Sequence, residues 1–135
     1  MKNLRSRIVR VLIAHFGDDD RRIEHALRVL HHADIISADY PGCDMDIVIA
    51  CALLHDVGIK LSEEKHGYNN GKTQEEYGPP IAEKLLNSIG FPPGKIETVK
   101  DIIGNHHSLS RYGYPELTIL KAADKIVNSK DLNLG

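Results

Sequence analysis

The sequence contains no tryptophan, and aromatic residues account for only 5% of its 135 positions. Proteins that hold single-stranded nucleic acid stack the bases on aromatic side chains, so this composition argues against that class of protein. A charge of one sign is also lacking, because 17 Lys and Arg residues against 19 Asp and Glu residues give a net charge of −2. We therefore expect no binding to nucleic acid or to an anionic membrane, since both need a basic excess.

Cysteines and long apolar runs are scarce as well. Cys43 and Cys51 have no CxxC partner and are too few for a disulfide framework. The apolar run 11–14 near the N-terminus is shorter than the roughly 7–15 residues of a secretory signal core. No stretch approaches the roughly 20 apolar residues of a membrane span. We therefore expect a cytoplasmic protein with reduced thiols.

The apolar residues recur with a helical period along nearly the whole chain, with no internal repeat. A chain of this length is typical of one domain and can bury a core without disulfides. We expect residues 1–135 to form a single all-α domain, a compact bundle of about six helices. The first three expected helices run from Leu4 to His15–Gly17, over about residues 19–38, and from near Asp44 to His55–Asp56. The fourth runs from Pro79–Pro80 to Gly90, and the fifth follows Pro92–Pro93 and has an apolar face that extends to His106. The sixth has an apolar face from Leu117 to Val127.

Two of these segments have unusual composition. The run 47–54 is apolar on every side, and because no partner strand is evident we expect a central, fully buried helix. Residues 62–78 are polar and rich in turn formers, so we expect a long functional or mobile loop there. The next helix then starts at Pro79–Pro80, where a missing N–H costs least.

Eight histidines are present, an excess that favours metal binding or acid–base chemistry. His25 and His106 fall on apolar faces of expected helices, and His55–Asp56 ends the most apolar segment. Asp124 also lies on an apolar face, although a buried carboxylate without a partner costs several kcal/mol. A divalent metal shared by these side chains is the economical explanation, because it turns buried imidazole and carboxylate groups into ligands.

Each of these residues also has a simpler interpretation. A single inward histidine is more often a hydrogen-bonded core residue than a ligand, and Asp124 could pair with a Lys or Arg. The joint pattern, in which His55–Asp56 stands between an upstream His25 and a downstream Asp124, favours the metal. We assign no site role to the remaining histidines His15, His31, His32 and His66.

This order of residues resembles the H…HD…D signature of the HD-domain metal-dependent phosphohydrolases. The surrounding sequence is similar too, over roughly residues 20–128. The similar segments are RIEHALRVLHHAD (22–34), ACALLHDVGIK (50–60), the segment 78–107 and LKAADKI (120–126). The resemblance implies an all-α fold that holds one divalent cation through His25, His55, Asp56 and Asp124.

Mixed histidine and carboxylate ligands suit Mn, Fe, Co, Ni or Zn, with Mg also feasible. Such a metal lowers the pKa of a bound water, and the resulting hydroxide attacks a phosphoryl group. In this scheme Asp56 also accepts the proton of the water or bridges to a second ion. Lys60 holds a substrate phosphate as a point charge.

Some family members hold two metals, through a further histidine and a histidine pair. The pair is present here as His106–His107, but the other position is Gln74, a poor ligand for transition metals. We therefore favour one tightly bound metal with a weak or absent second site. His106 and His107 are then expected to contact the substrate phosphate or a metal-bound water, with Arg111 as another group for anions.

The expected substrate is a small phosphorylated molecule, with a nucleotide as the preferred kind because Tyr68, Tyr112 and Tyr114 could stack on a base. The favoured function is a metal-dependent phosphohydrolase. The alternative is a catalytically weak, metal-containing HD binding or regulatory module, and a di-iron oxygenase is a less favoured third. A homodimer is left open.

Overall fold

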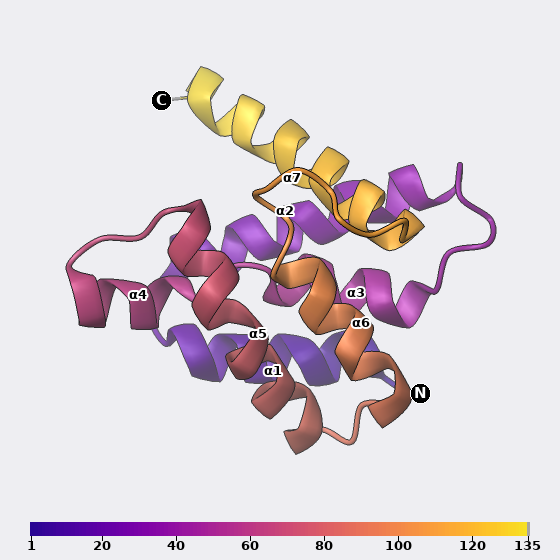
Figure 1. Ribbon diagram of the computed structural model, residues 1–135, viewed down its shortest axis with the longest axis horizontal. Helices are drawn as coiled ribbons and strands as arrows, with labels where there is room; N and C mark the ends of the chain where they lie inside the picture. Colours follow the sequence, from indigo (N-terminus) through magenta and orange to yellow (C-terminus); the bar gives the residue numbers. More distant parts are fainter. Residues whose placement is uncertain (135) are drawn as a thin grey trace.

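The computed structural model describes residues 1–134, with side chains described up to residue 130. Seven α-helices and no strand are found in this part of the chain (Figure 1). The expected all-α bundle is therefore confirmed, with one helix more than the number expected. The helices are α1 Leu4–Phe16, α2 Asp20–Ser37, α3 Met45–Leu54, α4 Ile59–His66, α5 Gly71–Ser88, α6 Pro93–Ile103 and α7 Pro115–Leu134.

Helix α3 is the centre of the bundle. Every residue from Ile47 to Leu54 is buried, and α3 packs against α1, α2, α6 and α7. Its start is fixed by Asp44, whose side chain accepts hydrogen bonds from the N–H groups of Asp46 and Ile47. The expected buried central helix is thus confirmed, and His55, which directly follows its last residue, is buried in the interior of the molecule.

Helix α2 is packed on more than one side. It contacts α1, α3 and α7, and the α2–α7 pair lies along one edge of the bundle (Figure 1). Asp19 caps its first turn by accepting a hydrogen bond from the Arg22 N–H. This arrangement places His25, in the second turn of α2, between α3 and α7.

The region expected to be a loop over residues 62–78 is mostly helical. Helix α4 ends at His66, and α5 begins at Gly71, well before Pro79–Pro80. The start of α5 is a capping box in which Asn70 and Thr73 exchange side-chain and main-chain hydrogen bonds. This cap satisfies two main-chain donors and is a stronger start signal than the prolines, which lie inside the helix. The loop prediction was wrong for this reason.

Helices α6 and α7 are joined by an irregular segment that carries His106 and His107. The buried side chain of Asn105 holds this segment, because its Nδ2 donates to the Leu109 carbonyl and its Oδ1 accepts from the Arg111 N–H. No helix in the part of the chain that the structure describes is long and apolar enough to cross a membrane.

Candidate metal centre

Three separate parts of the bundle bring four side chains together. His25 comes from α2, His55 and Asp56 follow α3, and Asp124 lies on α7. His25 Nε2 lies 3.1 Å from Asp124 Oδ1 and 3.5 Å from Asp56 Oδ2. His55 Nε2 lies 3.3 Å and 3.4 Å from the same two oxygen atoms. The residues that the sequence assigned to one metal thus converge, although they span ninety-nine positions from the first to the last.

The orientation of His55 is fixed by its other ring nitrogen. Nδ1 donates a hydrogen bond to the Ala52 carbonyl at 2.8 Å, so in the neutral ring Nε2 carries the lone pair. That Nε2 is completely buried and has no hydrogen-bond partner. A buried lone pair aimed at two carboxylate oxygens is unfavourable unless a cation or a proton lies between them.

His106 repeats this arrangement from the opposite end of the cluster. Its Nδ1 donates to the Ile103 carbonyl at 2.6 Å, and its buried Nε2 has no hydrogen-bond partner. Nε2 lies 3.9 Å from Asp56 Oδ1, while the other oxygen of Asp56 faces His25 and His55. The Asp56 carboxylate therefore lies between two sets of imidazole nitrogens.

The electrostatics of the cluster separate its members. Burial opposes a charge on His55, but Asp56 and Asp124 outweigh it and raise the pKa of His55 to about 9. Burial, together with the nearby His55 and His107, lowers the pKa of His106 to about 3. Burial alone would raise the pKa of Asp124, yet His25 and His55 hold it well below its usual range. His106 therefore stays neutral across the physiological range, with its lone pair available.

His107 lies next to the cluster, but a glutamine side chain occupies one of its nitrogens. The Gln74 amide nitrogen donates to Asn69 Oδ1 at 2.9 Å, so its oxygen is the acceptor that faces His107 Nε2. His107 Nε2 therefore carries a proton. The structure places Gln74 beside the histidine pair. Asp56, His106 and His107 still have one possible ligand atom each within 4.8 Å of one another.

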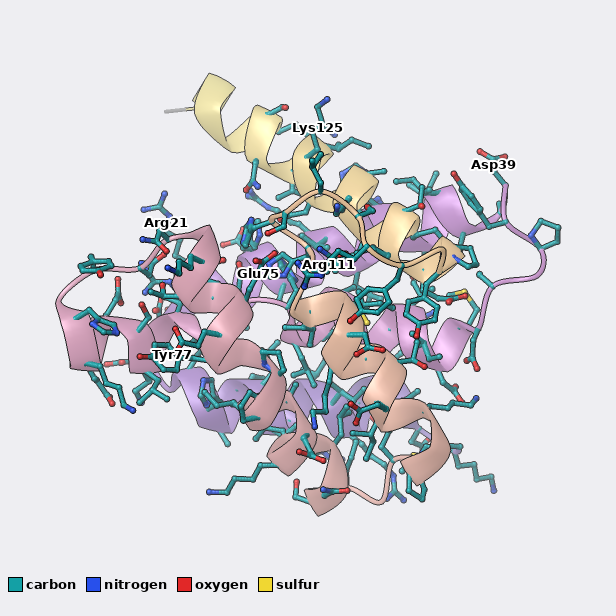
Figure 2. All side chains as sticks on the ribbon, viewed as in Figure 1. Arg21, Asp39, Glu75, Tyr77, Arg111 and Lys125 are labelled. Carbon is teal, nitrogen blue, oxygen red and sulfur yellow. The ribbon has the colours of Figure 1, made fainter. Side chains whose placement is uncertain are left out.

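Lys60 and Arg111 do not join the four side chains. The Lys60 ammonium is exposed and contacts the His15 carbonyl at 3.5 Å. Arg111 is exposed in the segment between α6 and α7, where its guanidinium donates to the Gly104 carbonyl (Figure 2). Their roles toward a substrate phosphate stay predictions.

A pocket opens beside Asp124 and contains groups that the sequence analysis did not single out. Its volume is about 420 Å³. The lining residues are His106, His107, Ser108, Lys121, Asp124, Lys125, Asn128 and Ser129. The four-residue spacing of Lys121 and Lys125 around Asp124 in LKAADKI was a readable signal, because residues so spaced are neighbours on a helix surface.

The donor set fits a divalent cation of the borderline class. Two imidazole nitrogens and two carboxylates converge. His55 Nε2 has no hydrogen-bond partner, so a metal ion could bind it without breaking a hydrogen bond. The remaining four histidines have other surroundings. His15 donates to the Val57 carbonyl, His66 pairs with Tyr77, and the rings of His31 and His32 contact each other.

The family model described as HD domain matches residues 22–129 of the chain. This range is well over half of the sequence and includes all four converging side chains. No curated protein and no solved structure matches the chain.

Proposed function

Because this chain belongs to the HD-domain family, we propose that it is a metal-dependent phosphohydrolase that acts on a small phosphorylated molecule. One observation carries the proposal. The Asp56 carboxylate lies between His55 Nε2 and His106 Nε2, two buried nitrogens without hydrogen-bond partners. Such an arrangement needs a positive charge at its centre, which is the proton of His55 when no metal is bound and a divalent cation when one is.

His25, His55, Asp56 and Asp124 would hold the metal. When bound, a divalent cation supplies a water of lowered pKa and a positive charge for the phosphoryl oxygens. The Ala52 carbonyl fixes the ring of His55, because its hydrogen bond to Nδ1 leaves Nε2 as the ligand atom. The cluster is therefore oriented by the fold before any ligand arrives.

The second oxygen of Asp56 has a separate use. Oδ1 points toward His106 and away from His25 and His55, which face Oδ2. It is placed to accept a proton from a water at the centre, which is the general-base role expected for this residue. His106, neutral and buried, can orient that water through its Nε2 lone pair.

The tyrosines give little support to the finer prediction that the substrate is a nucleotide, because their rings already contact other side chains. The rings of Tyr112 and Tyr114 stack on each other with centroids 5.4 Å apart, and Tyr114 donates a hydrogen bond to Asp101. Tyr68 stacks on His66. Nucleotides therefore belong in a substrate panel beside sugar phosphates and other small phosphate esters.

The test combines metal analysis with a phosphatase screen. The purified protein is assayed for bound metal by elemental analysis, and then for phosphate release from the panel with Mn, Fe, Co, Ni, Zn or Mg added. Asp56→Asn is expected to abolish metal-dependent phosphate release. Asp39→Asn is the matched control, because Asp39 is exposed and lies at the far end of the molecule in Figure 2. Bound metal without phosphate release would contradict the hydrolase and favour the binding module.

A further inference from the structure

The pocket beside the candidate metal centre has a cationic wall. We propose that Lys121 and Lys125 of α7 form a subsite for a second anionic group of the substrate. The substrate is then a phosphate ester that carries another phosphate or a carboxylate. This inference rests on the proposed function, because it describes the distal part of the molecule whose phosphate meets the metal centre.

The pocket connects the two regions directly. His106 and Asp124, which belong to the candidate metal centre, line it together with Lys121 and Lys125. It is an open depression with a volume of about 420 Å³, which gives room for a small molecule that keeps part of its surface in solvent. A phosphate held at the centre would therefore extend the rest of its molecule into a space bordered by two ammonium groups.

Helix geometry sets both lysines around Asp124. Lys121 and Lys125 are four residues apart, so their side chains are neighbours on the surface of α7. Asp124 lies three residues after the first lysine and directly before the second. The subsite and a candidate ligand thus project from the same turn of one rigid element, which fixes their separation better than a loop would.

Neither lysine is neutralised by an acid. Lys121 Nζ donates to the Ser108 carbonyl at 2.6 Å and to Ser110 Oγ at 2.7 Å, which leaves one of its three protons for a ligand. Lys125 is exposed on α7 (Figure 2). No hydrogen bond or ion pair joins it to another residue in the described part of the chain. An anion at this wall would therefore not have to displace a carboxylate.

The other groups in the pocket indicate what joins the two anions. Ser108, Asn128 and Ser129 offer hydroxyl and amide groups, and no apolar side chain is among the described residues that line the pocket. Such a lining suits a hydroxylated body and provides little for a flat aromatic base. A sugar bisphosphate meets these requirements most directly, and a nucleoside bisphosphate meets the anionic one.

The experiment compares matched pairs of substrates. Fructose 1,6-bisphosphate is assayed against fructose 6-phosphate, and adenosine 3′,5′-bisphosphate against adenosine 5′-monophosphate. In at least one pair, kcat/KM is expected to favour the second anionic group by about tenfold, the effect of one charge-assisted hydrogen bond. The pair that shows it distinguishes a sugar from a nucleoside body. Lys125→Gln is expected to remove the preference by raising KM for the bisphosphate more than for the monophosphate.

Lys84→Gln serves as the control, since Lys84 is an exposed lysine of α5 outside the pocket. Equal kcat/KM within both pairs, unchanged by Lys125→Gln, would overturn the subsite and leave the hydrolase intact.

Where no compound is hydrolysed, calorimetric titration of the same bisphosphates into the metal-loaded protein replaces kinetics. Binding that weakens about tenfold in Lys125→Gln but not in Lys84→Gln would support the subsite while the proposed function fails. Absence of both hydrolysis and binding would overturn both.

Discussion

The main chains of Gly58 and Gly78 meet where α5 crosses the turn that follows α3. A Cβ atom on Gly58 would lie 2.6 Å from the Gly78 nitrogen and 3.1 Å from its Cα. A Cβ atom on Gly78 would in turn lie 2.8 Å from a methyl carbon of Ile103 at the end of α6. This contact without side chains lets α5 and α6 approach the turn that carries His55 and Asp56.

Gly58→Ala is therefore expected to destabilise the protein by about 1–3 kcal/mol, because a backbone atom cannot move aside as a flexible side chain can. The same change should weaken metal binding, since it separates α5 from the turn that contains Asp56. Denaturant unfolding and elemental analysis measure the two effects. Gly42→Ala is the control, because a Cβ atom there would meet nothing within 4 Å. An unfolding free energy equal to that of the control would refute the close-packing argument.

Metal affinity should depend on pH through His55. In the metal-free protein its pKa is raised to about 9, so the ring is protonated at neutral pH, whereas a metal requires the neutral ring. Binding below this pKa therefore releases a proton, and affinity should rise by about tenfold per pH unit from about pH 6.5 to about pH 8.5. Calorimetric titrations in two buffers of different ionisation enthalpy measure the protons released. Affinity that is constant over this range would contradict the assignment of His55 as a ligand.

Asn105 links the stability of the fold to the position of the histidine pair. The side chain is completely buried and satisfies two main-chain groups, the Leu109 carbonyl and the Arg111 N–H. Asn105→Ala leaves both without this partner, which should cost about 1–3 kcal/mol of unfolding free energy. Because the same segment holds His106, we also expect phosphatase activity to fall by up to about a hundredfold. Asn87→Ala on the exposed side of α5 is the control, and equal losses in the two variants would contradict this role.

The convergence of the four candidate ligands was predictable because polar residues on apolar faces are costly. Asp124 lies on the buried stripe of α7, and His55 follows the most apolar run of the chain, so both needed a common partner in the interior. Helical periodicity alone shows that these side chains face the core. The same argument applied to His25 and His106 on their apolar faces, and the resemblance then selected His25, with His55, Asp56 and Asp124, as the ligand set.

The surroundings of the site could not be predicted in the same way. Helix α4 buries only Ile59 and Ser62, which is too few residues for a periodic signal. The approach of Gly58 to Gly78 depends on how α5 packs and leaves no pattern in sequence. Lys60 follows the HD pair closely, yet the start of α4 directs its ammonium to the His15 carbonyl. Tertiary packing decides each of these features.

Gln74 determines whether a second metal can bind. Asp56, His106 and His107 already gather one possible ligand atom each, but the Gln74 oxygen accepts a hydrogen bond from His107 Nε2–H. Gln74→His replaces a poor ligand with an imidazole, so we expect the metal content to rise from one to two ions per chain. Elemental analysis after dialysis against each metal measures this ratio. Gln74→Ala removes the hydrogen bond without supplying a ligand and should keep one ion. Two ions in the unaltered protein would show that Gln74 does not exclude the second metal, and one ion in Gln74→His would show that the histidine pair cannot complete a site.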